Sequence, residues 1–534
     1  MKKRLIALLC IAALAVGVFT GCGAKKEETP AEPEKVETTQ PETEAPAEEQ
    51  PAEETDSELP YVELDWYTAT GEMPGSQRVL EVLNEYLLEK LNCKLNLRYF
   101  GADYLEKMPT MLQSGEDLGM VRVLSQIPYN SYAQQGAYYP MNDLLDQYGA
   151  GTKGLFSEDV WDSLKIDGNI YCVPTLKDNC YIMGYLYNAD LADEMGIDMD
   201  NTGWQNGRDA GEDLLKFMEI RNELHPEWEG IPLVSNIPIV CPYFFNVETI
   251  GGNLFSVCNV PGMEELAGYD CDTVVNLYET DEFREFCRMQ QRLLEAGVYA
   301  YDYSEYSNLY AEPATLMHLA WGFTWVDEHI FSDSITTKLK VFDNIYTDAD
   351  NYTSAATAIS ANCADPERAM MVIELFNTDP YVATLIRFGV EGEHWTTDEN
   401  GNMTFKGTAN EDPSNRAFYY WYGNDFGNLT ITRTPEDVGG PDGVVFDKMI
   451  ECNNSAKLAA HMGFVLNTDN IQNEIAACTN VVQEFSALTT GHYNSQEEVD
   501  AALDEMIAKL KANGVDKIVA ECQAQIDAWN AAQK

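Results

Sequence analysis

The side chains in this sequence that could recognise a ligand are mainly aromatic rings and fixed polar groups. The sequence contains 29 Tyr, 20 Phe and 9 Trp. Flat rings stack on the apolar faces of sugar rings, while fixed amides and carboxylates bind the hydroxyls. Trp66, Tyr67 and Glu72 follow one another at a predicted strand end, and Trp421 lies close to Asn424. These residues are candidate ligand contacts, although an aromatic residue in a chain of this size is as often part of the core.

The common motifs of hydrolytic enzymes are absent from the sequence. There is no Gly-x-Ser-x-Gly elbow, no His-Glu-x-x-His pair and no Gly-rich phosphate loop, and the six histidines lack metal-binding spacing. The 88 acidic residues include many pairs that could act as acid and nucleophile, but abundance does not place two carboxylates across one bond. We therefore expect a binding protein without enzymatic activity or cofactor, and a surface glycoside hydrolase is the less favoured alternative.

One segment has the spacing of a calcium-binding loop. Asp198, Asp200 and Thr202 stand at positions one, three and five, Gly203 stands at six, and Asp209 stands at twelve. Position twelve of such loops is usually Glu, and a polar connector before a helix has the same composition. The segment is a weak calcium candidate, and we predict no metal site.

The amino-terminal residues predict export and attachment of a lipid. Residues 1–21 combine a basic start with an apolar run, and Phe19-Thr-Gly-Cys22 resembles a bacterial lipobox, whose cysteine carries a diacylglycerol. Residues 22–60 are rich in Glu, Pro and Thr and contain little that could be buried, which predicts a disordered acidic tether. We expect the mature protein on the extracellular face of the cell membrane, held by Cys22 alone, an arrangement that suits a Gram-positive envelope.

The net charge and the cysteines exclude several partners. The formal charge of -54 disfavours nucleic acid and anionic lipid surfaces, because both require basic patches. The thirteen cysteines form no Cys-x-x-Cys pair, which argues against a zinc ribbon or a redox motif. We expect most of them to be buried thiols, with Cys172 and Cys180 as a local candidate for a disulfide.

The folded part begins with a pattern typical of a parallel α/β sheet. Residues 61–67 and 93–99 alternate as strands, and Ser76 can cap the helix between them. A right-handed crossover puts the loop after the first strand at the carboxyl edge of the sheet, where open α/β folds bind ligands. Near the other end of the chain, residues 469–488, 495–512 and 515–529 are predicted to form three helices.

Several ordered segments resemble one known family. They are Asp103-Tyr-Leu-Glu-Lys-Met108 with Ser114-Gly-Glu-Asp117, Gly136-Ala-Tyr-Tyr-Pro140, Asp167-Gly-Asn-Ile-Tyr171 with Leu186-Tyr-Asn-Ala-Asp190, and Ala364-Asp-Pro-Glu-Arg-Ala369. With them the chain resembles the family 1 extracellular solute-binding proteins, which are the lipoprotein receptors of bacterial ABC importers and include the maltose-binding proteins. The C-terminal helices resemble an uncharacterised domain of one branch of this family.

The resemblance implies further ligand contacts. Pro242-Tyr243-Phe244 is similar to a segment that lines the second lobe of maltose-binding proteins, and Trp321 and Trp325 stand in a segment similar to one whose aromatics stack on sugar. The resemblance also suggests polar contacts at Lys177 and Asp178, just past the first crossing between lobes, and at Gln126, after a first-lobe strand. Lys177 and Asp178 could instead form a solvated pair of little energetic value.

The resemblance implies an α/β fold with the two lobes of a type II periplasmic-binding protein and a C-terminal helical extension. The expected boundaries are residues 61–174 and 340–362 for lobe one, 175–339 and 363–440 for lobe two, and 441–534 for the helical region. The implied function is capture of a carbohydrate by a monomer, which delivers it to the transmembrane subunits of an ABC permease. A peptide or another small solute is the alternative ligand.

Overall fold

The computed structural model describes residues 59–127, 129–236, 245–263, 265–300, 313–321, 335–412, 415–419, 427–435 and 444–533. The predicted signal peptide, Cys22 and nearly all of the predicted tether lie outside these ranges. None of the helices in the described part is both long and apolar enough to cross a membrane.

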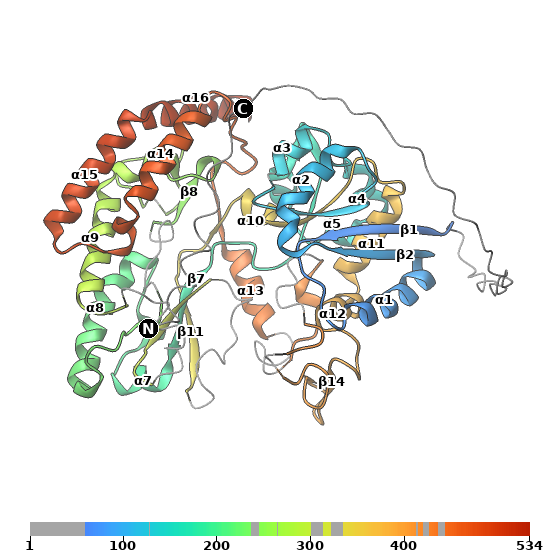
Figure 1. The fold of residues 1–534 in the computed structure, drawn as a ribbon, viewed down its shortest axis with the longest axis horizontal. Helices are drawn as coiled ribbons and strands as arrows, with labels where there is room; N and C mark the ends of the chain where they lie inside the picture. The colour runs from blue at the N-terminus through green and yellow to red at the C-terminus, as the bar shows by residue number, and fades with distance from the viewer. Residues whose placement is uncertain are drawn as a thin grey trace, which may run out of the picture. The chain divides into compact units, whose positions relative to one another are not determined.

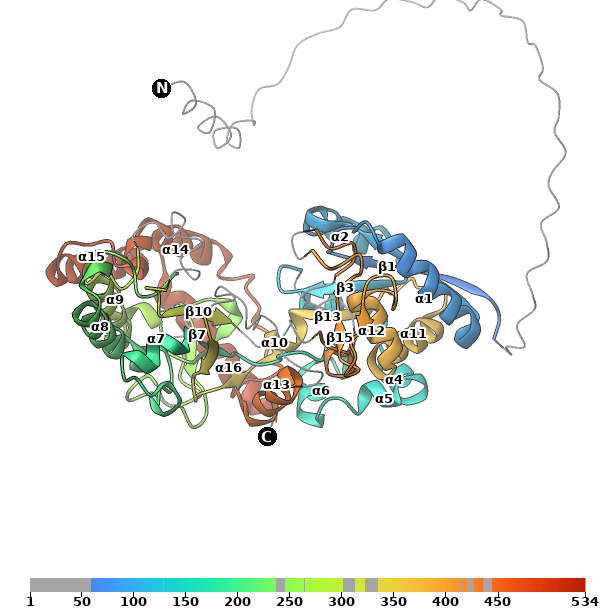
Figure 2. The same ribbon diagram turned by 90° about the horizontal axis from the view of Figure 1, so that it is seen from below.

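The first lobe is built on a five-stranded sheet in the order β2-β1-β3-β13-β6 (Figures 1 and 2). β1 (Val62–Thr68) lies parallel to β2 (Cys93–Tyr99) and β3 (Met120–Leu124), and β13 (Ala355–Ile359) is antiparallel to β3 and to β6 (Val173–Pro174). This sheet confirms the predicted strand-helix-strand unit, since α1 (Ser76–Leu91) joins β1 to β2.

Periodicity explains these first elements. Alternate residues of β1, namely Leu64, Trp66 and Thr68, are buried, as expected for a strand covered on one face. In α1 the buried apolar residues are Val79, Leu83 and Leu87, which recur at helical spacing. The remaining helices and short strands of this lobe are α2 (Tyr104–Ser114), α3 (Tyr129–Gln134), α4 (Asn142–Tyr148), α5 (Ala150–Lys153), α6 (Glu158–Ser163), β4 (Lys165–Ile166) and β5 (Asn169–Ile170).

The predicted boundaries of the first lobe need correction. Helices α11 (Pro366–Thr378) and α12 (Pro380–Phe388), which were expected in lobe two, bury Ala369, Ile373 and Val382 in the same core as β1 and α1. Figure 2 shows both helices beside α1 and α4. β11 (Thr337–Val341), by contrast, pairs with a second-lobe strand, so the return to lobe one begins later than residue 340.

The described residues between 389 and 419 also attach to the first lobe. They include the hairpin of β14 (Thr396–Thr397) and β15 (Met403–Thr404). Gly75 N, at the start of α1, donates to Ala417 O at 2.8 Å, and Arg78 forms an ion pair with Glu393 at 2.9 Å. The prediction of 363–440 as part of lobe two is therefore wrong for this segment as well. The motif resemblance carried no information about which core these residues join.

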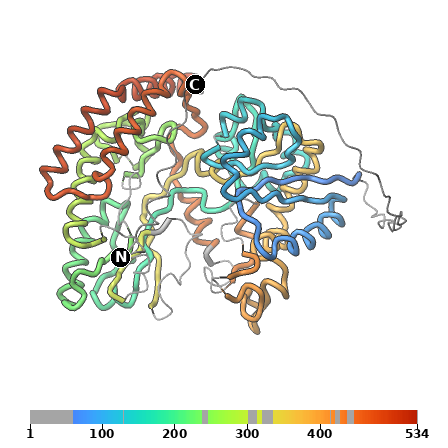
Figure 3. The backbone as a smooth tube through the Cα atoms, viewed as in Figure 1, coloured from blue at the N-terminus to red at the C-terminus, as the bar shows by residue number. Residues whose placement is uncertain are grey.

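The second lobe is built around the antiparallel sheet β10-β7-β11. The central strand β7 (Met183–Asn188) pairs with β10 (Met317–Trp321) on one side and with β11 on the other, and Figure 3 shows these distant chain segments running side by side. The other elements of the lobe are α7 (Ala189–Glu194), α8 (Gly207–Leu224), β8 (Val247–Thr249), β9 (Val257–Asn259) and α9 (Asp281–Glu295). Tyr185, Leu214 and Phe286 are fully buried in its core.

The three predicted C-terminal helices are present as α14 (Gln472–Glu484), α15 (Gln496–Ala512) and α16 (Val515–Gln533). The Ser495 side chain caps α15 by accepting a hydrogen bond from Glu498 N, as its sequence predicts. Ile518, Cys522 and Ile526 of α16 are buried in the second-lobe core. These helices therefore complete lobe two; Figure 1 shows them beside α9.

The candidate disulfide between Cys172 and Cys180 is not formed. Both side chains are buried thiols, and burial raises the pKa of each above its ordinary value. The expectation of thiols that act as small apolar residues is confirmed at these two positions.

Candidate functional site

The chain passes from lobe one to lobe two in residues 175–182, and helix α13 (Val444–Ser455) holds this passage. Asn453 Oδ1 accepts a hydrogen bond from Asn179 N at 2.9 Å, and Asn453 Nδ2 donates to Lys177 O at 2.6 Å. Phe446 and Met449 of the same helix share a small hydrophobic core with Cys180 and Ile182 of this passage. One helix thus fixes the backbone of the first crossing through a side chain far away in sequence.

A second passage, residues 342–354, lies against the first. Thr347 Oγ1 donates to Asn179 O at 2.6 Å, and Tyr181 N donates to Tyr346 O at 2.8 Å. The short strand β12 (Tyr346–Thr347) also pairs with β16 (Lys457–Leu458), and α10 (Ala349–Thr353) follows it. The two crossings and the end of α13 therefore form one hydrogen-bonded junction, which we call the crossing junction.

A third connection, residues 427–435, returns close to the first lobe. Leu429 N donates to Leu176 O at 3.0 Å. Gly427 has φ near +60°, and a Cβ there would lie 2.1 Å from Phe376 O, so only glycine fits this approach of the chain to α11.

Lys177 and Asp178 are part of the crossing junction and are not solvated. Lys177 Nζ lies 3.4 Å from Asp178 Oδ1 and 3.2 Å from Asp178 O. The side chains are 14% and 9% exposed. A pair so enclosed cannot be dismissed as a surface ion pair, because burial reduces screening by solvent. The predicted site residues Lys177 and Asp178 thus lie where the lobes are joined.

Two tyrosine rings in contact and a buried carboxylate occupy the same junction. The rings of Tyr181 and Tyr346 have centroids 4.7 Å apart, and Tyr181 Oη donates to Asp348 Oδ2 at 3.1 Å. Asp348 also caps α10 by accepting from Asn351 N. Burial, followed by the charge of Asp350, raises the pKa of Asp348 to about 7. A pKa near 7 makes the charge of this carboxylate depend on pH in the neutral range, within the crossing junction.

Ser235 and Asn236 form a polar cluster with His318 of β10, on the second-lobe sheet. Ser235 Oγ lies 2.7 Å from His318 Nδ1, and the Asn236 amide bonds the backbone of Leu319 through both its oxygen and its nitrogen. Burial lowers the pKa of His318, which favours the neutral imidazole. A neutral imidazole has one donor and one acceptor, the combination that a sugar hydroxyl can match.

The predicted residues at the edge of the first-lobe sheet differ in accessibility. Trp66 is 1% exposed, with its ring 4.9 Å from that of Phe376, so it belongs to the core and offers no surface to a solute. Tyr67 is half-buried, and its ring meets Phe100 edge-on at 5.4 Å. Glu72 and Gln126 are exposed in the loops that follow β1 and β3.

The other predicted contacts cannot be placed. Tyr243, Phe244, Trp325, Trp421 and Asn424 lie outside the described residues. For Trp321 the backbone alone is described: it pairs with Met183 across the strands β10 and β7.

The loop with calcium-like spacing caps a helix. Asn206 accepts hydrogen bonds from Arg208 N and Asp209 N at the start of α8, and Asp209 Oδ2 accepts from Gln205 N at 2.8 Å. Asp198 Oδ2 is engaged by Asn201 Nδ2 at 2.8 Å, and Thr202 lies one residue past the short helix that contains Asp200. Within the described ranges, no three His, Cys, Asp or Glu side chains converge on a point that could hold a metal ion.

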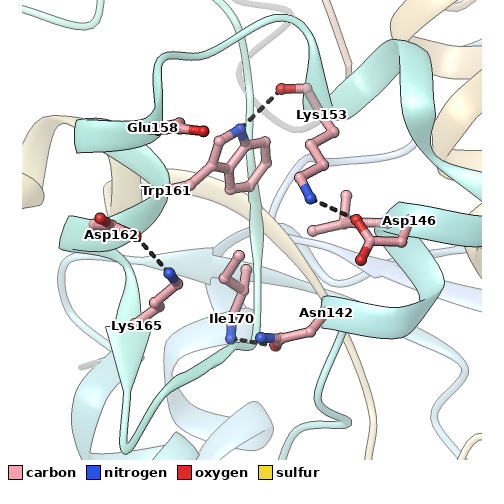
Figure 4. Close-up of a pocket in the computed structure, with 9 residues that line it drawn as sticks. Asn142, Asp146, Lys153, Glu158, Trp161, Asp162, Lys165 and Ile170 are labelled. Atoms are coloured by element: carbon pink, nitrogen blue, oxygen red, sulfur yellow. Dashed lines mark hydrogen bonds and ion pairs between the residues drawn. The ribbon is translucent and has the colours of Figure 1, made fainter.

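A cavity of about 330 Å3 lies wholly in the first lobe (Figure 4). Two Lys–Asp ion pairs, Lys153–Asp146 and Lys165–Asp162, lie on either side of Trp161, whose Nε1 donates to Lys153 O at 2.9 Å. Each lysine is thus paired with an aspartate, Glu158 adds a further carboxylate to the lining, and no second-lobe residue lines the cavity. It is therefore not the space between lobes that the resemblance implies.

Sequence reasoning missed the residues that organise the crossing junction. Asn453 and Asn179 are 274 positions apart, and Tyr346 and Asp348 stand in a segment with no motif. The pairing of Ser235 with His318 was missed for the same reason. Only knowledge of which segments cross between the lobes could have identified them.

Comparison with known proteins supports the predicted resemblance. Residues 460–531 match a family model described as a domain of unknown function, DUF3502. A carbohydrate ABC transporter substrate-binding protein of Streptococcus pneumoniae serotype 4 (strain ATCC BAA-334 / TIGR4) is 25% identical over 475 residues, which is 86% of this chain and 89% of that protein.

Solved structures agree on the fold. The N-glycan transport solute binding protein NgtS from Streptococcus pneumoniae matches 89% of this chain and 100% of its own, with a TM-score of 0.71 and 22% identity. The structure of its complex with Man5GlcNAc also matches 89% of this chain and 100% of its own, with a TM-score of 0.61 and 23% identity. The expected fold, that of a two-lobed solute-binding protein with a C-terminal helical domain, is confirmed.

Proposed function

We propose that this chain is the substrate-binding protein of an ABC importer, which captures a carbohydrate between its two lobes and delivers it to the membrane permease. The observation that carries the proposal is the match over 475 residues to a carbohydrate ABC transporter substrate-binding protein. NgtS, whose fold this chain shares, has a solved complex with the glycan Man5GlcNAc, which favours an oligosaccharide over a monosaccharide.

The crossing junction suits this role, because it is the connection about which two lobes would move. A solute that touches both lobes only in the closed arrangement shifts the equilibrium toward closure by its difference in affinity. The ring contact between Tyr181 and Tyr346 and the hydrogen bonds of Asn453 would then define the pivot. We expect small-angle X-ray scattering to show a smaller radius of gyration with the bound glycan than without it, and an unchanged profile with a bound glycan would contradict closure.

Contacts to the solute are proposed on both lobes. In lobe one the candidates with accessible side chains are Tyr67, Glu72 and Gln126. On lobe two we add His318 and Asn236 to the segments of Tyr243, Phe244, Trp321 and Trp325. Trp421 and Asn424 complete the predicted set, and Lys177 and Asp178, predicted as polar contacts, are better placed to support the junction than to bind the solute's hydroxyls.

We infer a binding function and no catalysis. The relatives named above are binding proteins. The test against the alternative is direct: incubation with oligosaccharides should release no reducing ends. Release above a heat-inactivated control would favour a glycoside hydrolase instead.

Attachment through a lipidated Cys22 at the extracellular face of the membrane is part of the proposal, as is a monomeric state. Mass spectrometry of the cell-derived protein should find a diacylglycerol on Cys22, and Cys22→Ser should release the protein into the medium. A Cys22→Ser variant that remains in the membrane fraction would contradict the anchor.

A further inference from the structure

Arg387 of α12 is a buried cation. Its side chain is 5% exposed, and its guanidinium carbon lies 4.9 Å from the ring centroid of Phe388 and 5.5 Å from that of Phe446. Its guanidinium donates to Thr432 Oγ1 at 3.1 Å, while the buried Nε has no acceptor in the described part of the chain. Among the described residues no carboxylate lies within ion-pair distance of this guanidinium.

Two other buried arginines show how this protein normally treats such a group. Arg221 donates to the carbonyl oxygens of Ile231, Pro232 and Ala314 at 2.6 to 3.1 Å. Arg368 likewise donates to several carbonyl oxygens at the start of the first lobe. Backbone acceptors thus surround both guanidinium groups, whereas none of the carbonyl oxygens around Arg387 accepts from it in the part of the chain described.

The buried charge and the N–H donors of Arg387 are poorly compensated by the described residues around them. A guanidinium keeps its proton in proteins, and an uncompensated buried charge is strongly destabilising. The faces of Phe388 and Phe446 attract the positive charge of the guanidinium. They do not supply the oxygen acceptors that its N–H groups require. The remaining donors need an acceptor, and the charge needs an anion.

A small cavity lies at this position. Arg387 lines it together with Phe376, Ala383 and Ile386 from the two helices and Asn428, Leu429 and Thr432 from the third connection. Its lining contains no acidic side chain. The space available to the centre of a water-sized particle is about 10 Å3, which admits about one such particle and excludes a sugar or an amino acid.

From this cavity and its orphaned donor we propose that Arg387 binds a small monovalent anion of the chloride class. Thr432 positions the guanidinium, because its hydroxyl accepts from Arg387 and donates to Leu429 O at 2.8 Å. The anion accepts from Arg387 Nε and neutralises the guanidinium. It joins α12 to the third connection, and Phe446 extends the contact to α13. The site is distinct from the proposed solute contacts and does not depend on the proposed function.

The test is the thermal stability of the full chain in different anions at constant ionic strength. Starting from sodium gluconate, replacement by chloride or bromide should raise Tm saturably, because a ligand that binds only the folded state stabilises it. Arg387→Met should abolish this saturable rise. The matched control Arg78→Met removes an exposed, ion-paired arginine of the same lobe and should retain it.

The proposal is overturned if the wild-type Tm is the same in chloride and gluconate, or if Arg387→Met retains the chloride dependence. Should Arg387→Met not fold, crystals of the wild-type protein grown in bromide decide the matter. An anomalous peak within hydrogen-bond distance of Arg387 Nε supports the site. Absence of a peak there, with a water in its place, contradicts it.

Discussion

Asp348 shows how a single buried residue links the crossing junction to pH. Burial, the charge of Asp350 and the more distant Glu248 favour its neutral form, although Asn351 and Tyr181 donate hydrogen bonds to it. Its pKa of about 7 lies well above the 3.8 of an ordinary aspartate. A raised carboxylate pKa means that the folded state binds the extra proton, so the folded protein loses stability as the pH rises from about 4 to 7.

We predict that Asp348→Asn removes this loss. Between pH 5 and pH 8 the wild-type protein should lose about 2–3 kcal/mol relative to the variant, since Asn never ionises. Its amide oxygen can still accept from Asn351 N, and its amide nitrogen can donate to Tyr181 Oη in place of the second carboxylate oxygen. Chemical denaturation at both pH values measures the difference. The control is Asp343→Asn, an exposed position on the same connection. A variant with the same pH dependence as the wild type would refute the effect.

At the scale of elements, helix α13 is predicted to stabilise the first crossing through one side chain. Asn453→Ala removes the acceptor of Asn179 N and the donor to Lys177 O, so two enclosed backbone groups lose their partner. The expected loss is about 1–3 kcal/mol of unfolding free energy. Asn454→Ala is the matched control, because that residue is exposed on the same helix. Equal urea midpoints for the two variants would show that these hydrogen bonds contribute nothing.

The C-terminal helices are joined to the second lobe through His461. This buried side chain lies between Glu248 of β8, with Nδ1 2.9 Å from Oε2, and Asp272, with Nε2 3.3 Å from Oδ1; Trp529 of α16 packs against the ring. Burial lowers the pKa of His461, but the hydrogen bond and charge of Glu248 and the charge of Asp272 together raise it above 6.5.

A histidine whose pKa is higher in the folded protein than in the unfolded chain stabilises the fold when it is protonated. The full contribution is present below the pKa of the unfolded chain and disappears as the pH rises through the pKa of the folded protein. We therefore expect His461→Gln to lower Tm more at pH 6 than at pH 9. His225→Gln, a change in a more accessible pair with Glu194 and Glu227, serves as the control. A Tm difference independent of pH would mean that the histidine acts only by packing.

Some elements could be predicted from sequence, and others could not, for a physical reason. β1, α1 and β2 have local signals, because each buries one face at its own periodicity. The helices of the C-terminal domain carry capping residues such as Ser495. The placement of α11 in lobe one has no local signal, since an apolar helix face fits either core. The burial of Trp66 by Phe376 likewise depends on a residue 310 positions away.

At the scale of the whole molecule, the second lobe is complete only with the C-terminal helices. Val257 and Phe286 share one buried core with Leu503 and Ile518. Deletion of residues 468–534 should therefore expose that core and lower the cooperativity of unfolding of lobe two. Truncation after Asn530, which removes the exposed Ala531 and Ala532 together with the last two residues, is the control. A deletion variant with unchanged urea midpoint and slope would show that the domain is an independent appendage.

The central claim is that the two lobes capture a carbohydrate. The most direct measurement is a thermal-shift titration of residues 55–534, which form one compact unit, against oligosaccharides with short peptides as the comparison. At 100 times the dissociation constant a glycan should add about 2.7 kcal/mol of stability, and His318→Ala should weaken the response. Stabilisation by one glycan series is the predicted result. Stabilisation by peptides alone, with no response to any glycan, would contradict the account.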